Sequence, residues 1–342
     1  MIEIDGIIYN IQRYGGITVY SNELLKLLEA EQVPHSLSLL GQPIGEPHPA
    51  SPTVIRPYRL FERYRTAKVG SDAAIFHSTY YRTPRPRGKV RQVVTVHDFI
   101  YERFSSGLRK AAHSCQKFLA VRSADAIICV SSRTADDLKE FIGPVRAPIH
   151  VIHNGVSDKF RVLDEADIQQ GRRAPFVLYV GQRAGYKNFA RLVSAMAHLP
   201  VMQLICVGGP EFGAMELREM GEEVTSRLQH LRHVSEDDLN LLYNQAHCLV
   251  YPSTYEGFGI PVVEAMRAGC PVVCGPCEAV IEVGGDALLI AEGEDVKPLV
   301  QAIRRLSSSE RNDFVARGLL RSKRYSWSRA HANTLEVYRT LL

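Results

Sequence analysis

The stretch Cys248-Leu-Val-Tyr-Pro-Ser-Thr-Tyr-Glu-Gly-Phe-Gly-Ile-Pro-Val-Val-Glu-Ala-Met-Arg267 runs from a short apolar segment through a glycine-containing loop into a helical pattern. The apolar segment has the length of a strand. Pro261 suits the first turn of a helix, because an N–H there would have no helical partner. Gly257, Gly259 and Ile260 border a loop in which the backbone is accessible and the helix start favours an anion. The stretch therefore predicts a strand–loop–helix unit of a parallel α/β sheet, with a ligand at the carboxyl end of the strand.

Two carboxylates belong to this unit. Glu256 comes before the predicted helix and Glu264 about one turn into it, so both could reach one ligand. A tight turn and a helix dipole that favours acidic residues would explain the same stretch without any ligand.

Strand-sized runs alternate with helical patterns on both sides of this stretch, which predicts an α/β protein with doubly wound sheets. In the second half the expected strands are Phe176–Val180, Gln203–Val207, Cys248–Tyr251, Val272–Cys274 and Ala287–Ile290; in the first half they are Val33–Leu40, Ala74–His77, Val93–His97, Ala126–Val130 and Ile149–Ile152. A polar stretch without periodicity, 157–174, is the expected linker. The 342 residues thus predict two domains, 1–160 and 170–325, followed by a terminal helix over 326–342.

The composition is that of a globular protein, with 45% hydrophobic and 23% charged residues. The first residues lack the pattern of a signal peptide, and no apolar run approaches the length of a membrane span, so we expect a cytoplasmic location. The seven scattered cysteines suggest reduced core residues and no disulfide framework.

Further candidate site residues lie near expected helix starts. Arg183 and Lys187 follow the strand Phe176–Val180, where two cations could neutralise a diphosphate or could simply be solvated. Gly15 and Gly16 precede a helix but lack the spacing of a dinucleotide fingerprint. His97 ends an apolar strand, where a lone histidine is more often structural than functional.

Two other kinds of chemistry find little support. Cys274-Gly-Pro-Cys277 matches the tetrad of thioredoxins, but Val273 stands where they carry a tryptophan, so we do not expect redox activity. No His-Glu-x-x-His or Asp-x-Asp motif is present, so we expect neither a metal nor another cofactor.

The segment from Arg56 to Arg91 holds ten basic and two acidic residues. Aromatic residues are interleaved with the cations, namely Tyr58, Phe61, Tyr64, Tyr80 and Tyr81. Charge alone fits a solvated face, nucleic-acid binding or contact with an anionic membrane.

Taken together and in this order, the motifs resemble the GT4 family of retaining glycosyltransferases, which have the GT-B fold. The resemblance rests on Gly15-Gly16, Thr95-Val-His97-Asp98, 124–131, 151–155, 181–188, the segment from Glu256 to Glu264 and Ser326-Trp327. The opening Gln12-Arg-Tyr-Gly-Gly and the His97-Asp98 pair are most similar to the mannosyltransferase-type enzymes of bacterial O-antigen and capsule synthesis.

This resemblance implies two Rossmann-like domains facing a cleft, an N-terminal one for the acceptor and a C-terminal one for the nucleotide-sugar, with the last helix crossing back to the N-terminal domain. Arg183 and Lys187 would bind the donor diphosphate and Glu264 the ribose. Glu256 and the backbone of Gly257, Phe258, Gly259 and Ile260 would hold the sugar and phosphate. Gly15 and Gly16 would approach the diphosphate from the other domain, and His97 would contact the sugar near the reacting carbon. Many relatives carry arginine where Gln182 stands, so the role of Arg183 assumes a shift by one residue.

The implied function is metal-independent transfer, with retention, of a hexose onto a glycan or lipid-linked oligosaccharide for surface polysaccharide (O-antigen, lipopolysaccharide or capsule). The expected donor is GDP-mannose. Alternatives are a transferase for a UDP- or dTDP-sugar (glucose, N-acetylglucosamine or rhamnose) and a non-catalytic sugar-nucleotide or glycan-binding subunit. Because such enzymes act on lipid-diphosphate-linked sugars, we expect the segment Arg56–Arg91 to contact the anionic inner face of the cytoplasmic membrane and not nucleic acid.

Overall fold

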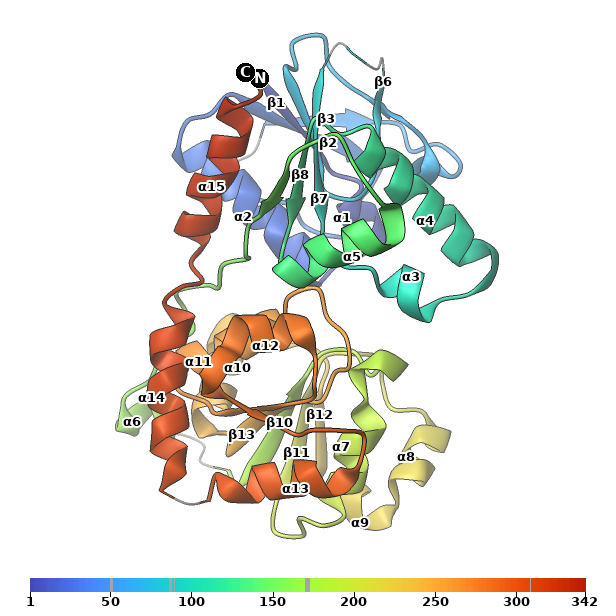
Figure 1. The fold of residues 1–342 in the computed structure, drawn as a ribbon. Helices are drawn as coiled ribbons and strands as arrows, with labels where there is room; N and C mark the ends of the chain where they lie inside the picture. Colours follow the sequence, from blue (N-terminus) through green and yellow to red (C-terminus); the bar gives the residue numbers. More distant parts are fainter. Residues whose placement is uncertain (50–51, 86–87, 89, 170–172, 308) are drawn as a thin grey trace. The chain divides into compact units, whose positions relative to one another are not determined.

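The computed structural model describes residues 1–49, 52–85, 88, 90–169, 173–307 and 309–342. The chain divides into two compact units: unit 1 holds residues 1–155 and 327–342, and unit 2 holds 156–326 (Figure 1). Each unit is built on a parallel sheet with helices, which confirms the predicted fold class. The expected divisions at 160 and 326 lie close to those of the structure, and the division at 170 lies outside the described residues.

Unit 1 contains a seven-stranded parallel sheet in the order β3-β2-β1-β5-β7-β8-β9. Its strands are β1 (Ile2–Asp5), β2 (His35–Leu40), β3 (Thr53–Arg56), β5 (Ile75–Ser78), β7 (Arg91–Val96), β8 (Ala126–Cys129) and β9 (Ile149–Val151). Two short strands, β4 (Ala67–Lys68) and β6 (Pro84–Arg85), form a separate pair. β1 and β3 were not predicted from the sequence, and His97, which was expected inside a strand, comes directly after β7, which ends at Val96.

The helices of unit 1 are α1 (Ile8–Ile11), α2 (Gly16–Ala30), α3 (Ile100–Phe104), α4 (Gly107–Arg122), α5 (Ser132–Ile142) and α15 (Trp327–Arg339). The terminal helix α15 belongs to this unit, in contact with α2. It is separated in sequence from the rest of unit 1 by all of unit 2, and in Figure 1 it lies beside α2.

Unit 2 contains a six-stranded parallel sheet in the order β12-β11-β10-β13-β14-β15. Its strands are β10 (Phe176–Val180), β11 (Gln203–Val207), β12 (Leu228–Leu231), β13 (Cys248–Tyr251), β14 (Val272–Cys274) and β15 (Leu288–Ile290). Its helices are α6 (Glu165–Gln169), α7 (Phe189–Met196), α8 (Ala214–Met220), α9 (Glu222–Thr225), α10 (Glu236–Gln245), α11 (Ile260–Arg267), α12 (Glu278–Gly284), α13 (Val296–Arg305) and α14 (Glu310–Ser322).

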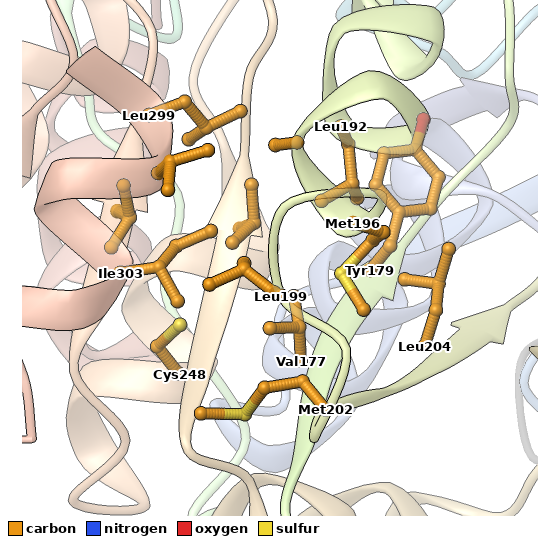
Figure 2. Packing of buried hydrophobic residues seen from close by; sticks show 14 of the residues in the cluster. Val177, Tyr179, Leu192, Met196, Leu199, Met202, Leu204, Cys248, Leu299 and Ile303 are labelled. Atoms are coloured by element: carbon orange, nitrogen blue, oxygen red, sulfur yellow. The ribbon is translucent and has the colours of Figure 1, made fainter. Parts of the chain in front are cut away.

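The core of unit 2 lies between its sheet and the helices α7 and α13, which contact each other (Figure 2). Val177 and Leu204 of the sheet pack with Leu192 and Met196 of α7 and with Leu299 of α13. This cluster fixes the strands from which the candidate site extends.

The described part of the stretch 157–174, residues 157–169 and 173–174, is not the free linker that its polarity suggested; residues 170–172 lie outside the described residues. The backbone N–H of Arg161 donates to Asn240 Oδ1 at 3.0 Å, and that of Leu163 donates to Asn244 Oδ1 at 2.9 Å. Two asparagines of α10 therefore hold this stretch against unit 2. Because the contacts are polar, the stretch has no apolar periodicity from which its packing could have been predicted.

The basic segment from Arg56 to Arg91 is partly an internal element. Arg56 pairs with Glu3, Arg82 pairs with Asp5, and both carboxylates are buried in β1. Tyr80 and Tyr81 are buried as well, whereas Tyr58, Phe61 and Tyr64 are exposed. Arg87 and Lys89 lie outside the described residues. Much of the excess positive charge thus compensates buried carboxylates, so it is not all presented to a surface partner.

Within the described part of the chain, no helix is both long enough and apolar enough to cross a membrane. All seven cysteines are free thiols, and all but Cys115 are buried.

Candidate functional site

The carboxyl edge of the sheet in unit 2 carries the strand–loop–helix unit that the sequence predicts. β13 ends at Tyr251, and α11 begins at Ile260 with Pro261 in its first turn. Gly259 has a φ of 98°, and a Cβ added there would lie 3.2 Å from Val280, so the loop requires glycine. No side chain of the described structure caps α11. Pro261 has no N–H, and the N–H of Val262 donates to the carbonyl of Gly259 at 3.0 Å, so this helix start favours an anion chiefly through the positive end of its dipole.

The structure brings Lys187 and Glu256 together at this edge. Lys187 closes a short 3₁₀ turn after β10, and its Nζ lies 2.5 Å from Glu256 Oε1 and 3.2 Å from the hydroxyl of Tyr251. Both charged side chains are largely buried. Each therefore compensates the charge of the other, and any anion that reaches Lys187 meets an ammonium already held in place.

Arg183 has other partners. Its Nε donates to Glu216 Oε1 at 2.6 Å, its Nη2 donates to the carbonyl of Pro210 at 2.7 Å, and its guanidinium lies 3.7 Å from the ring centroid of Phe212. Only Nη1 makes no hydrogen bond to a described residue. A role of Arg183 in binding the diphosphate stays a prediction, for which the buried Nη1 amino group is without a partner among the described residues.

Sequence reasoning missed the turn that holds Arg183. Gly208 and Gly209 follow β11 with positive φ values, and a Cβ on Gly209 would lie 3.0 Å from Arg183 Nη1. A glycine pair directly after a strand is the signal that could have indicated it.

Glu264 lies on α11 and is half-buried. The hydroxyl of Tyr243, on α10, donates to Glu264 Oε2 at 2.9 Å. Burial raises the pKa of Glu264 to about 7, against the lowering effect of this hydrogen bond. The carboxyl group therefore changes its charge near neutral pH. Nothing in the sequence pattern singled out Tyr243.

His97 lies in unit 1, directly after β7, and is buried. The ring centroids of His97 and Tyr20 are 5.0 Å apart in an edge arrangement. Burial lowers the pKa of His97 to about 3, and a hydrogen bond to the backbone of Thr79 opposes that shift. Its Nε2 has no hydrogen-bond partner among the described residues. At neutral pH the ring is thus uncharged, and because Nδ1 is the nitrogen left to bond Thr79, Nε2 is the one that can accept from a ligand.

A buried hydrogen-bond chain that the sequence did not suggest leads to His97. The hydroxyl of Tyr338 in α15 lies 2.5 Å from His77 Nδ1, His77 Nε2 lies 2.8 Å from Thr95 Oγ1, and Thr95 Oγ1 lies 2.9 Å from the hydroxyl of Tyr20. The chain joins the terminal helix to the ring that packs against His97.

Gly15 and Gly16 also lie in unit 1, at the start of α2, where no side chain of the described structure caps the helix. Their expected contact with a donor stays a prediction.

Cys274 and Cys277 are buried, and burial raises the pKa of each thiol to about 12. A Cβ on Gly275 would lie 2.8 Å from the carbonyl oxygen of Pro252, so this glycine packs against the site loop. The tetrad has a packing role here, and thiols this basic are poor redox centres. No group of three or more His, Cys, Asp and Glu side chains among the described residues could hold a metal ion.

Models of two protein families match the chain. "Glycosyltransferase Family 4" matches residues 14–160, and "Glycosyl transferases group 1" matches residues 164–320. The chain thus carries one domain of each of these two glycosyltransferase families. The expected family is thereby confirmed.

Curated relatives of this glycosyltransferase include two proteins named for mannose transfer. The O-antigen chain mannosyltransferase B of Escherichia coli is 35% identical over 48% of this chain and 46% of its own. The O-antigen chain mannosyltransferase RfbU of Salmonella typhimurium is 29% identical over 70% of this chain and 68% of its own. The match thus spans about half of the first relative and two thirds of the second.

Solved structures share the fold of this glycosyltransferase over nearly its whole length. A sucrose-phosphate synthase from Thermosynechococcus elongatus is 20% identical, with a TM-score of 0.82 over 99% of this chain and 98% of its own. WaaG, a glycosyltransferase involved in lipopolysaccharide biosynthesis, is 14% identical, with a TM-score of 0.76 over 98% and 99%. These likenesses confirm the GT-B fold.

Proposed function

We propose that this chain is a retaining hexosyltransferase that moves mannose from GDP-mannose onto a glycan or lipid-linked oligosaccharide during the synthesis of a bacterial surface polysaccharide. The observation that carries this proposal is the Lys187–Glu256 pair at the carboxyl edge of the sheet, next to the uncapped start of α11. A fixed cation beside the positive end of a helix dipole suits a leaving nucleoside diphosphate, whose charge grows as the glycosidic bond breaks.

The proposed mechanism uses the chain's own residues and no metal. Lys187 and the first turn of α11 stabilise the departing diphosphate, and Arg183 offers Nη1 to it. Glu264 accepts hydrogen bonds from the ribose. His97 is neutral and accepts one hydrogen bond from the transferred sugar through Nε2, so it orients the sugar and does not act as an acid. The acceptor attacks from the face that the diphosphate leaves, and a phosphate oxygen takes the acceptor's proton, which retains the anomeric configuration.

The relatives' names support mannose and O-antigen. A second candidate is transfer from a UDP- or dTDP-sugar. The HepE protein of Anabaena, whose structure was solved in complex with UDP-glucose, shares the fold of this chain with a TM-score of 0.75 at 16% identity. The third candidate is a non-catalytic subunit that binds a sugar nucleotide or a glycan.

A thermal-shift screen with GDP, UDP, dTDP and their sugar conjugates separates these candidates. A nucleotide at about 100 times its Kd adds about 2.7 kcal/mol to the native state. We expect stabilisation by GDP and GDP-mannose, followed by transfer in which NMR shows a product that keeps the donor's anomeric configuration. Selective stabilisation by UDP or dTDP would discard mannose, an inverted product would discard retention, and binding without turnover of any donor would favour the subunit.

A further inference from the structure

Unit 1 presents a cluster of exposed apolar side chains within and directly after its edge strand β3. Leu60 and Phe61 are 73% and 68% exposed, and Ile55, Tyr58 and Tyr64 are exposed as well. Single exposed apolar side chains are ordinary, but five within ten residues mark a surface that meets a partner. These five residues are called the apolar turn below.

Hydrogen bonds hold the apolar turn in place. Phe61 has a φ of 56°, in the left-handed region that a bulky residue rarely adopts. The next residue, Glu62, is buried and accepts from Arg59 Nε at 2.5 Å and from the buried Arg82 Nη2 at 2.6 Å. The backbone therefore holds Leu60 and Phe61 outward in an unfavourable conformation, and buried ion pairs fix its base. Strain of this kind is typical of functional segments.

Unpaired cations flank the apolar turn. Arg65 donates through Nε to the carbonyl of Leu60 at 2.8 Å, and Lys68 lines the same cavity as Arg59. Lys68 lies opposite Arg85 in the β4–β6 pair. Arg65, Lys68 and Arg85 are exposed, and within the described ranges none of the three forms an ion pair. The surroundings of the turn are thus positively charged.

We propose that the apolar turn docks this chain on an anionic lipid bilayer, with Leu60 and Phe61 inserted at the interface and Arg65, Lys68 and Arg85 against lipid phosphates. Aromatic and aliphatic side chains beside cations are the combination that favours the bilayer interface. A second copy of the same surface would bring like charges together, so the charge pattern favours lipid over self-association. The inference rests on the proposed function in one respect: docking would bring the enzyme to a lipid-linked acceptor.

Flotation of the full chain with vesicles tests the proposal. The probes are vesicles of phosphatidylcholine alone and of phosphatidylcholine with phosphatidylglycerol. We expect binding to the anionic vesicles and a loss of at least about tenfold in the partition coefficient for the double variant Leu60→Ser, Phe61→Ser. The matched control is Val201→Ser with Met215→Ser, which removes two similarly exposed apolar side chains of unit 2 and should bind like the wild type.

The charged part is tested by the triple variant Arg65→Gln, Lys68→Gln and Arg85→Gln, which should lose the preference for anionic vesicles. The proposal is overturned if the wild type binds no vesicle, if the double variant binds as well as the wild type, or if the turn instead mediates a dimer that the double variant separates in gel filtration. Thermal shifts with nucleotides on the same samples report the donor site independently. A variant that is still stabilised by nucleotide but no longer floats with the vesicles has lost docking alone. A wild type that floats with the vesicles but is not stabilised by any nucleotide would refute the proposed function and support the docking surface.

Discussion

At the scale of single residues, the contact between Lys187 and Glu256 determines which substitutions can reveal the site. Each of these largely buried side chains is the charge partner of the other. Removing one therefore leaves an uncompensated charge, and a loss of turnover could follow from unfolding alone. The pair has to be tested with its stability measured alongside its activity.

Lys187→Ala should lower the free energy of unfolding by about 3–5 kcal/mol, because it leaves Glu256 buried and unpaired. The double variant Lys187→Met, Glu256→Gln removes both charges and should recover most of that stability. Turnover should stay at least about 10²-fold lower in both, because the cation facing the diphosphate is gone. Urea unfolding and donor turnover measure the two effects. A double variant with restored turnover would remove Lys187 from the proposed mechanism.

Glu264 should make nucleotide binding depend on pH near neutrality. Its pKa is raised to about 7, so below that pH the carboxyl group is protonated and accepts fewer hydrogen bonds from a ribose. Affinity for the nucleoside diphosphate should therefore rise as the pH increases through about 7. Calorimetric titration across this range measures it. Glu264→Gln is the control, because the nucleotide's own phosphate titration remains in that variant while the Glu264 contribution disappears.

Tyr243 is expected to position Glu264 and to tune this titration. Its hydrogen bond lowers the pKa of Glu264, so Tyr243→Phe should raise that pKa further and move the rise in affinity to higher pH. A structural role alone would lower stability without moving the midpoint. Equal midpoints in the variant and the wild type would therefore contradict the positioning role.

At the scale of elements, the central strand β1 shows why a buried strand can be impossible to predict from apolar periodicity. Its sequence, Ile-Glu-Ile-Asp, has only two apolar residues, yet Glu3 and Asp5 are both buried. Arg56 and Arg82 compensate them from a segment far along the chain. A strand whose charges are neutralised by distant residues carries no apolar run, so periodicity could not find it.

The terminal helix α15 is joined to the sheet of unit 1 by a hydrogen bond as well as by apolar packing. Tyr338→Phe would leave His77 Nδ1 buried without its partner, and should lower the free energy of unfolding by about 1–3 kcal/mol. Burial lowers the pKa of His77 to about 3, so protonation does not relieve the loss at neutral pH. Arg339→Ala, at an exposed neighbour in the same helix, should change stability little. Urea unfolding of the two variants measures the difference, and equal stabilities would argue against the hydrogen bond.

At the scale of the whole molecule, the chain builds two α/β units and returns its last helix to the first. The predicted donor residues divide between them, with Gly15, Gly16 and His97 in unit 1 and Arg183, Lys187, Glu256 and Glu264 in unit 2. In the proposed mechanism, protein groups alone neutralise the charge of the diphosphate.

Metal independence is the prediction at this scale. Donor turnover should be unchanged by EDTA and should not increase with added Mg²⁺ or Mn²⁺, because Lys187 and the first turn of α11 supply the positive charge. Turnover assays before and after chelation measure it. A loss of activity with EDTA that Mg²⁺ restores would show that the diphosphate needs a metal.

The sequence by itself determined the fold class, the family and the strand–loop–helix unit around Glu256, because these depend on local patterns: apolar runs of strand length, glycines at a loop and a proline at a helix start. It also placed Lys187 and His97 at the carboxyl ends of their strands, since parallel strands all end at one edge of a sheet.

Only the tertiary structure decided which of these residues meet and in what charge state. In the structure Lys187 forms an ion pair with Glu256, and Arg183 forms one with Glu216. Tyr243 donates a hydrogen bond to Glu264, and burial lowers the pKa of His97 so that its ring is neutral. It also separated the internal cations from the exposed apolar turn within a segment that looked uniformly basic. Ion pairs and burial join residues that are far apart in the chain, and local periodicity carries no information about those distances.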